Sequence, residues 1–293
     1  MPIEGNFNAG IPRVAPYVGP GDIVSGAGSW YGLRAYTAAI AIAGTQAAVN
    51  IRRGGDNVTA DVLIATNGGL GLTANQSGGA PGDNGLTPAA FSTHGGGNGT
   101  LFVTKLYDQS GNGRDVSQAT AANQPNFVLN ALGSFPAVQS TLSPLLYLTG
   151  SGSGTRAQPY TSSGVIKKAS SGSGFAALGD LQTEAIAVGE DLSNVIMRLD
   201  GSTTITVAQS NNTWYAVQGL ANGASSELYI NGSAHTGLAG SASNWPGTNV
   251  AVCNDSFSSG WDGSLMEVGI WFQGDQSANF STLNNNQRNY WGF

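Results

Sequence analysis

The sequence predicts an all-β protein: an antiparallel β-sandwich with one or two short helices and an extended N-terminal arm. Glycine occupies 44 of the 293 positions, whereas charged residues make up only 10%, against about 25% in an average soluble domain. Hydrophobic residues still account for 40%, which is enough for a core and excludes a disordered chain. Short apolar runs recur roughly every ten residues between turn residues, as is typical of β-sandwiches.

Residues 1–28 show no periodic pattern, and we expect them to form the extended arm. Prolines and glycines alternate along this segment, and its apolar residues are too dispersed to form one element. A solvated tail is usually polar and charged. Because this segment carries Phe7, Ile11, Tyr17 and Val18, we expect it to dock on its own domain or on a neighbouring subunit. A frayed terminus is the alternative.

The remaining residues, 29–293, are expected to form a single domain. Two intervals rich in glycine and serine or asparagine, residues 67–84 and 149–175, have the composition of long loops. They do not separate stretches of different composition, so neither predicts a domain boundary.

Three segments carry helix signals. A helix is expected over residues 30–43, with Ser29 as its N-cap and Gly44 just past its end. A second, short helix is expected to begin at Thr87-Pro88, with the proline in the first helical position. A polar helix over residues 277–290 is expected to end the chain.

Runs rich in β-branched and aromatic residues predict the strands. Asn231-Gly232 follows one of these runs and is the strongest short-range signal for a β-hairpin, since both residues tolerate positive φ. The expected strands cover residues 48–53, 60–65, 101–108, 127–130, 144–148, 184–188, 194–199, 203–207, 214–217, 227–230 and 265–272.

The charge balance excludes several partners. Eleven Lys and Arg against seventeen Asp and Glu give a net charge of −6, and no basic stripe is present for nucleic acid or a membrane surface. No apolar run is long enough to insert into a bilayer. The N-terminal residues lack the pattern of a signal peptide, and the one cysteine, Cys253, cannot form an internal disulfide. We therefore expect a protein made in a reducing cytosol.

Several polar and aromatic residues are candidates for binding. Asp108 and Asp115 flank a glycine turn, where they either cap backbone N–H groups or bind calcium or sugar hydroxyls. Trp245 and Trp261 lie in expected loops, where exposed rings would stack on sugars. The histidines and Cys253 lack metal-ligand spacing, so we predict no metal and no cofactor, with calcium as the open alternative.

The arginine pair Arg52-Arg53 lies near Asp56 and Asp61. Such a grouping forms either a structural ion-pair cluster or a clamp on a substrate. We expect the ion-pair cluster. Cys253 has no base nearby in the sequence, so we expect a buried thiol that packs as a small hydrophobic residue.

Two stretches carry a resemblance to a known family. The run from Val103 to Asp115, followed by Gln124-Pro125, and the run from Ala48 to Asp61 both resemble the catalytic domain of the family B α-L-arabinofuranosidases. The second half is similar more generally to laminin-G-like lectin domains. The resemblance implies a concanavalin A-like β-sandwich, or jelly roll.

The arabinofuranosidase family implies a retaining glycosidase with two carboxyl groups about 5–5.5 Å apart. Asp255 precedes the final strand in the place of the family's acid/base. The family's nucleophile has no clear counterpart; Glu184 and Glu190 lie in the right region, but their surroundings differ. The family's disulfide cysteines are also missing. We therefore do not expect these residues to catalyse the reaction, and the enzyme remains one alternative.

The motif from Tyr107 to Gly113 is also associated with bacteriophage virion proteins. This chain resembles such proteins from Tyr17 to Ile23 and from Trp30 to Arg34 as well. This resemblance implies a virion structural protein, in a capsid decoration, fibre or tail. It would be made in the host cytoplasm, form homo-oligomers and contact other virion proteins through its arm. Its lectin-like sandwich would brace the particle or adhere to a host-surface glycan. The alternatives are a retaining glycoside hydrolase and a stand-alone lectin.

Overall fold

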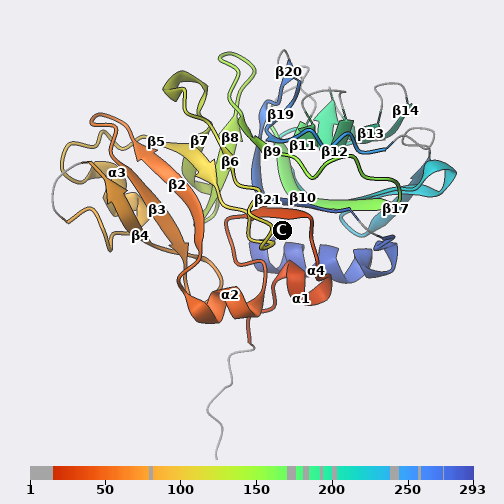
Figure 1. Ribbon diagram of the computed structural model, residues 1–293, viewed down its shortest axis with the longest axis horizontal. Coiled ribbons are helices and arrows are strands. Elements are labelled where there is room, and N and C mark those ends of the chain that lie inside the picture. Colours follow the sequence, from red (N-terminus) through yellow and green to blue (C-terminus); the bar gives the residue numbers. More distant parts are fainter. Residues whose placement is uncertain are drawn as a thin grey trace, which may run out of the picture.

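The structure is a computed structural model that describes residues 16–78, 82–169, 176–180, 185–191, 194–199, 203–237, 244–256, 259–272 and 274–293. Its strands are antiparallel, its helices are few and short, and two layers of strands enclose the core (Figure 1). The predicted all-β sandwich is therefore confirmed.

The chain contains four α-helices among its described residues: α1 (Pro20–Ile23), α2 (Ala38–Ala43), α3 (Pro88–Thr93) and α4 (Phe280–Trp291). The strands are β1 (Ser29–Gly32), β2 (Ala47–Arg53), β3 (Thr59–Ile64), β4 (Leu70–Ser77), β5 (Leu101–Leu106), β6 (Val116–Ser117), β7 (Asn126–Leu132), β8 (Phe135–Ser140), β9 (Leu148–Ser151), β10 (Tyr160–Lys168), β11 (Ala176–Asp180), β12 (Ala185–Asp191), β13 (Asn194–Leu199), β14 (Thr203–Ala208), β15 (Trp214–Ala221), β16 (Ser226–Ile230), β17 (Ser233–Gly237), β18 (Asn249–Val252), β19 (Asn254–Ser256), β20 (Ser259–Gly260) and β21 (Gly263–Trp271).

The two layers divide at β5. One edge of β5 pairs with β2, while along the other edge Lys105 and Leu106 pair with β6 and Phe102 pairs with β7. The first layer runs from β4 through β3, β2, β5, β6, β9, β18, β11 and β12 to β13 and β14. The second layer runs from β7 through β8, β21, β10 and β15 to β16 and β17. In Figure 1 these layers lie one above the other on the right-hand side.

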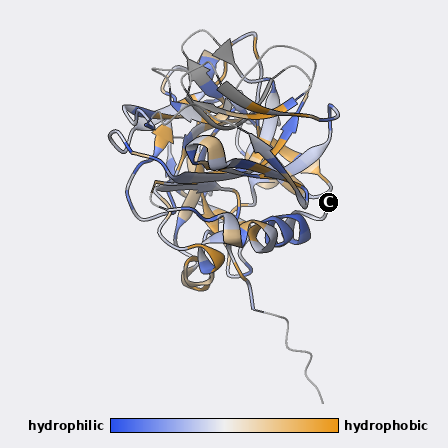
Figure 2. Ribbon diagram, turned by 90° about the vertical axis from the view of Figure 1, so that its right-hand side faces the viewer, coloured by the Kyte–Doolittle hydropathy of each residue, from blue (hydrophilic) through white to orange (hydrophobic). Residues whose placement is uncertain are grey.

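Helix α4 covers the outer face of the second layer. The central strands β10, β15 and β21 are consequently buried on both faces, whereas the outlying β16 alternates between buried and half-buried residues. Figure 2 shows α4 largely in hydrophilic colours. Its inward residues include the amides of Asn284 and Gln287, which are fully buried. Among the described helices, none is long and apolar enough to cross a membrane.

The helix expected over residues 30–43 is only half correct. Ser29–Gly32 forms strand β1, which pairs with β21 so that Trp30 lies opposite Gly269. A Cβ atom on residue 269 would lie 2.1 Å from the Trp30 ring. The indole fits there because glycine has no side chain. The helix begins only after Thr37, whose hydroxyl accepts from the N–H of Ile40. Gly44 ends it with φ of 62°, as predicted.

Both intervals expected to be loops contain strands. β4 lies within residues 67–84, and β10 within residues 149–175. The polar residues of β10 are accommodated because they face polar groups of the second layer and of α4: Ser163 Oγ accepts from Gln287 Nε2 at 3.0 Å. Of the strand expected at 144–148, only Leu148 is in a strand, β9.

Two local predictions are confirmed. The Thr87 hydroxyl accepts from the N–H of Ala90 at 3.2 Å and caps α3, with Pro88 in its first position. Asn231 and Gly232 both have positive φ and join β16 to β17, with Ile230 opposite Ser233.

The described part of the expected arm, residues 16–28, packs on its own domain. The N–H of Gly21 donates to Tyr36 O and that of Gly28 to Ile270 O, each at 2.7 Å. Tyr17 also lies against the domain, whereas Val18 is exposed. Phe7 and Ile11 lie outside the described residues, so docking through them stays a prediction.

Candidate functional site

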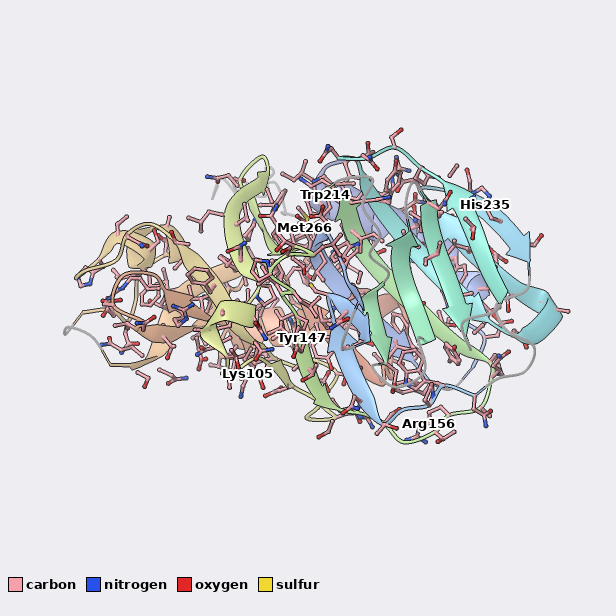
Figure 3. All side chains as sticks on the ribbon, turned by 90° about the horizontal axis from the view of Figure 1, so that it is seen from above. Lys105, Tyr147, Arg156, Trp214, His235 and Met266 are labelled. Atoms are coloured by element: carbon pink, nitrogen blue, oxygen red, sulfur yellow. The ribbon has the colours of Figure 1, made fainter. Side chains whose placement is uncertain are left out.

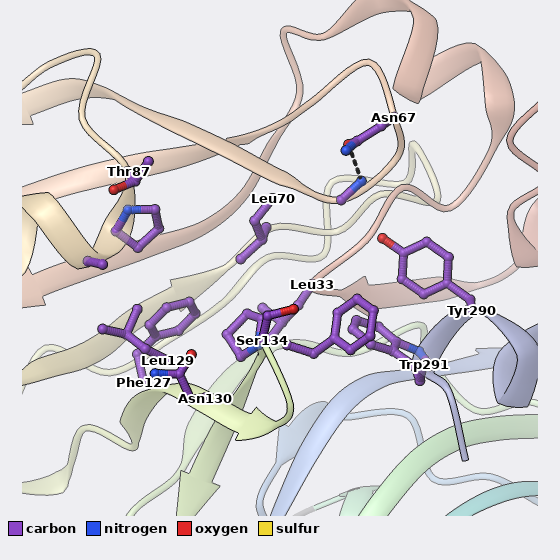
Figure 4. A pocket seen from close by; sticks show the side chains of 15 residues that line it. Leu33, Asn67, Leu70, Thr87, Phe127, Leu129, Asn130, Ser134, Tyr290 and Trp291 are labelled. Atoms are coloured by element: carbon purple, nitrogen blue, oxygen red, sulfur yellow. Dashed lines mark hydrogen bonds between the residues drawn. The ribbon is translucent and has the colours of Figure 1, made fainter. Parts of the chain in front are cut away.

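A pocket of about 350 Å³ opens between the first layer and the C-terminal end of α4, and we call it the aromatic pocket (Figure 4). The turn before β4, the start of α3, the β7–β8 hairpin and the end of α4 surround it. Its lining residues are Leu33, Asn67, Gly69, Leu70, Thr87, Pro88, Ala89, Phe127, Leu129, Asn130, Ser134, Phe135, Pro136, Tyr290 and Trp291.

Three aromatic rings form one wall of the aromatic pocket. The Phe135 ring lies 5.8 Å from the Tyr290 ring and 5.1 Å from the Trp291 ring, centroid to centroid. Tyr290 and Trp291 meet edge to face at 4.8 Å. Trp291 is buried, while Tyr290 and Phe135 are partly exposed. This wall therefore offers an apolar aromatic surface that carries a polar phenol at one end.

Uncharged polar groups complete the rim. Asn67 Oδ1 accepts from the N–H of Gly69 at 3.0 Å, the bond that is dashed in Figure 4, which leaves the amide nitrogen available. The side chains of Asn130 and Ser134 make no hydrogen bond to any described residue, and neither does the Tyr290 hydroxyl. An apolar pocket with a few convergent polar groups is the usual form of a small-molecule site.

A buried ion pair supports the aromatic wall from behind. Arg34 Nε and Nη2 donate to the two carboxylate oxygens of Glu267 at 2.7 and 2.8 Å, and neither side chain has any exposure. The Arg34 guanidinium lies 4.6 Å from the centre of the Tyr290 ring. Trp291 Nε1 donates to Glu267 Oε1 at 3.2 Å. Both aromatic residues are thus held against one fixed charge pair.

Burial raises the pKa of the Tyr290 hydroxyl to about 12, although the nearby Arg34 opposes this rise. The phenol is therefore neutral around pH 7 and can both donate and accept. None of the residues that line the aromatic pocket is acidic or basic. This uncharged lining suits binding of a neutral polar ligand.

Asp108 caps the glycine turn, which is the first of the two roles considered for it. Its Oδ1 accepts from the N–H groups of Trp30 and Ser110, and its Oδ2 from that of Arg114, all at 3.0 Å. Asp115 Oδ1 accepts from the N–H of Asp108 at 2.9 Å. These bonds occupy the Asp108 carboxylate, which is almost fully buried, and leave little room for a sugar hydroxyl.

The expected exposure of Trp245 and Trp261 is wrong, because both rings lie in the core. Trp245 pairs with Arg156 in an isolated β-bridge and packs 5.7 Å from Tyr160 and 6.0 Å from Phe272. A Cβ atom added to Gly263 would lie only 2.4 Å from the Trp261 ring, so the ring packs directly against this glycine. Neither indole can stack on a sugar in this position.

Asp255 and Glu190 lie at the same end of β11, on the two strands that flank it. Gly189 pairs with Ala176 on one side, and on the other side the N–H of Cys253 donates to Ala177 O. Glu190 and Asp255 follow these pairings in β12 and β19. Their side chains lie outside the described part of the structure, so their chemical roles stay predictions.

The structure also shows the surroundings of Cys253 and of the acidic residues near Arg53. Cys253 is fully buried, and burial raises the pKa of its thiol, as expected for a packing residue. Of the expected cluster of Arg52 and Arg53 with Asp56 and Asp61, the pair of Arg53 with Asp56 is confirmed at 2.6 Å, whereas Arg52 bonds to Gln124 and Asn57. Asp61 instead accepts from Asn50 and Tyr107. Among the described residues, no group of His, Cys, Asp or Glu side chains could hold a metal ion.

No family model matches this chain, and no curated protein does. Solved structures do match. The chain is similar to an arabinofuranosidase complexed with arabinofuranosyl-α-1,2-xylobiose, with a TM-score of 0.63, 16% identity, and coverage of 92% of this chain and 64% of that one. A GH54 α-L-arabinofuranosidase soaked with a cyclic sulfate inhibitor gives a TM-score of 0.62 at the same identity and coverage.

These similarities define the class of protein as a β-sandwich with the fold of the GH54 arabinofuranosidase structures. At 16% identity the likeness concerns the fold. The similarity confirms the fold that the sequence resemblance implied. The chain spans less than two thirds of the length of these structures.

Sequence reasoning did not find the aromatic pocket. Its wall combines Phe135 from a hairpin with Tyr290 and Trp291 from a helix more than 150 residues away. The one local signal is the adjacent Tyr290-Trp291 pair at the end of an otherwise polar helix.

Proposed function

We propose that this protein binds a neutral glycan through the aromatic pocket. The observation that carries the proposal is the partly exposed wall of Tyr290 and Phe135 beside the unpaired side chains of Asn130 and Ser134. A sugar ring presents an apolar face with hydroxyl groups around it, which matches an aromatic surface rimmed by amide and hydroxyl groups. The uncharged lining favours a neutral sugar.

The solved structure with arabinofuranosyl-α-1,2-xylobiose supports a sugar as ligand only through the shared fold. For this reason the first probes are arabino-oligosaccharides and xylo-oligosaccharides, alongside unrelated neutral oligosaccharides. Binding is measured on the full chain by titration calorimetry or by ligand-observed NMR.

Variants of the rim test the location of the site. Asn130→Ala, Ser134→Ala and Tyr290→Phe each remove one hydrogen-bonding group and keep the aromatic wall. We expect each to weaken sugar binding about fivefold, which corresponds to a net hydrogen bond of about 1 kcal/mol. Asn285→Ala, an exposed asparagine on the solvent side of α4, is the control and should bind normally. Unchanged affinity in all three rim variants, or no binding of any sugar, contradicts the proposal.

We also propose that the sandwich is displayed on a bacteriophage particle, where it associates with other virion proteins and with further copies of itself. Its support is the resemblance from Tyr17 to Ile23 and from Trp30 to Arg34. The test is co-sedimentation of the native protein with particles in a lysate of its source. A chain that stays in the soluble fraction contradicts particle display and leaves sugar binding untouched.

A retaining glycosidase is the second candidate, because the backbone brings Glu190 and Asp255 to the same end of β11. Retaining enzymes use two carboxyl groups on opposite sides of one glycosidic bond. Turnover of a chromogenic arabinofuranoside that is lost in both Glu190→Gln and Asp255→Asn supports this candidate. A folded protein that turns over no glycoside of a broad panel rejects it.

A further inference from the structure

A second pocket, of about 180 Å³, lies between the segment before β1, the turn after β5 and the loop before β10. We call it the arginine pocket. Figure 3 shows one of its residues, Arg156, at the edge of the molecule. The pocket is lined by Gly26, Ala27, Gly28, Asn112, Arg114, Arg156 and Phe272.

Neither guanidinium group of the arginine pocket has a carboxylate partner in the part of the chain that the structure describes. Neither Arg114 nor Arg156 forms an ion pair with any described residue. The nearest acidic residue in the sequence, Asp115, has its Oδ2 3.5 Å from Lys105, and Asp108 is occupied by backbone N–H groups. In a chain with a net charge of −6, two cations without a counter-charge in one small pocket are a feature that needs an explanation.

Both arginines are anchored by the fold. The N–H of Arg114 donates to Asp108 Oδ2 at 3.0 Å, and its Nη1 donates to Gly28 O. Arg156 is held through its backbone, which exchanges two hydrogen bonds with Trp245 at 2.9 and 2.8 Å. The turn that Asp108 caps therefore holds Arg114 at the pocket, and the core residue Trp245 holds Arg156 there.

The donors in the pocket are incompletely used. Arg156 Nε is buried and has no hydrogen-bond partner among the described residues. A buried donor without a partner is rare in native structures and unfavourable, so the Arg156 side chain gains from a conformation in which Nε meets an oxygen acceptor. Asn112 Nδ2 donates to Ala27 O at 2.9 Å, while its Oδ1 is available as an acceptor.

An apolar surface adjoins these donors. The Phe272 ring lies 5.9 Å from the Arg114 guanidinium. The backbone at Gly28 approaches this ring so closely that a Cβ atom there would lie 2.1 Å from Phe272 Cδ2. The pocket thus combines planar cationic forks, one amide acceptor and an aromatic ring.

We propose that the arginine pocket binds the carboxylate of an acidic sugar, such as a uronic acid. The arginine fork matches the two oxygens of a carboxylate, Asn112 Oδ1 accepts from a sugar hydroxyl, and Phe272 contacts the ring. This site is separate from the aromatic pocket and does not rest on it, since the two take ligands of different charge.

The test is calorimetric titration of the full chain with D-galacturonate, with D-galactose as the uncharged counterpart. We expect galacturonate to bind and galactose to bind at least tenfold more weakly at this site. Arg156→Gln should lower galacturonate affinity about tenfold or more, because hydrogen bonds to charged groups are the strong ones. Arg114→Gln should do the same.

Two controls make the result decisive. Arg52→Gln removes a cation outside the pocket, where Arg52 bonds to Gln124 and Asn57, and should leave galacturonate binding unchanged. Asn130→Ala, in the aromatic pocket, should also leave it unchanged even if neutral glycan binding fails altogether. Equal binding of galacturonate and galactose, or unaltered binding by both pocket variants, overturns the proposal. Sodium acetate or phosphate that binds as tightly as galacturonate overturns the assignment to a sugar.

Discussion

Arg53 has no solvent exposure, yet its guanidinium keeps its charge because acceptors surround it. It donates to both carboxylate oxygens of Asp56, at 3.0 and 2.6 Å, to Asp83 at 2.6 Å and to Phe91 O. His94 Nδ1 lies 2.7 Å from the same Asp83 oxygen. The sequence indicates the pair of Arg53 with Asp56, three residues apart. It does not indicate Asp83, which comes from an interval expected to be a loop.

The hydrogen bond from Arg53 holds the pKa of Asp56 below its usual value. A carboxyl group with a lowered folded-state pKa stabilises the protein above the unfolded pKa of about 3.9, and this contribution disappears as the pH falls through the folded value. We therefore expect Asp56→Asn to cost about 1 kcal/mol at pH 7, since the pair is partly exposed, and to cost little at low pH. Urea unfolding at both pH values measures this difference.

Asp275→Asn is the matched control for this pH dependence. Asp275 is exposed, and its Oδ1 accepts from the N–H of Ser277 at 2.9 Å, a contact that an asparagine reproduces. Its unfolding midpoint should follow that of the native chain at both pH values. A loss in Asp56→Asn that is equally large in acid contradicts the assigned role of the Arg53 bond.

At the scale of elements, the sequence predicts strands where the hydrophobic pattern and turn chemistry are local, as in the β16–β17 hairpin. It fails for β10, because a strand buried on both faces, by the first layer and by α4, needs no alternation of polar and apolar residues. Ser163 of β10 and Gln218 of β15 bond to each other and to the α4 amides of Gln287 and Asn284. Such a polar contact between distant elements leaves no periodic signal in either sequence.

The amide of Gln287 tests this contact between α4 and the sheet. Its Oε1 accepts from Gln218 Nε2 at 2.6 Å, and its Nε2 donates to Ser163 Oγ at 3.0 Å. Gln287→Ala leaves both partners buried without it, and we expect a loss of about 2 kcal/mol in the free energy of unfolding. Asn285→Ala on the exposed side of the same helix should change it by less than about 0.5 kcal/mol. Equal effects of the two substitutions would mean that the buried amides contribute nothing specific.

At the scale of the whole molecule, both pockets form where segments far apart in the chain meet. The aromatic pocket joins the β7–β8 hairpin to α4, and the arginine pocket joins Arg114 to Arg156 and Phe272. The sequence did single out the turn from Asp108 to Asp115, with capping of backbone N–H groups as one of two roles for its aspartates. The structure shows Asp108 in that capping role, and one of the N–H groups that it accepts from is that of Arg114. The sequence shows which chemical groups each residue can offer. It does not show which residues meet in a pocket, because that depends on how the strands of both layers pair.

The segment before β1, residues 16–28, packs into the core of the molecule. Val24 and Ala27 are buried in a cluster with Trp30, Tyr36, Trp271 and Leu283. Val24 O accepts from Tyr36 Oη at 2.8 Å and from Trp271 Nε1 at 3.2 Å. Residues 16–28 therefore pack into the folded domain, which is one of the two docking places that the sequence analysis expected for this segment.

Truncation measures how much this segment contributes. A chain that starts at residue 29 loses the burial of Val24, about 1.5–3 kcal/mol, and leaves the Tyr36 hydroxyl and Trp271 indole N–H without their acceptor, at about 1–3 kcal/mol each. We expect it to be less stable than a chain that starts at residue 16 by about 4 kcal/mol or more, or not to fold. Urea denaturation followed by tryptophan fluorescence compares the two directly. If both chains unfold at the same urea concentration, residues 16–28 are a removable arm. A loss of particle association on their deletion is then due to lost docking and not to unfolding.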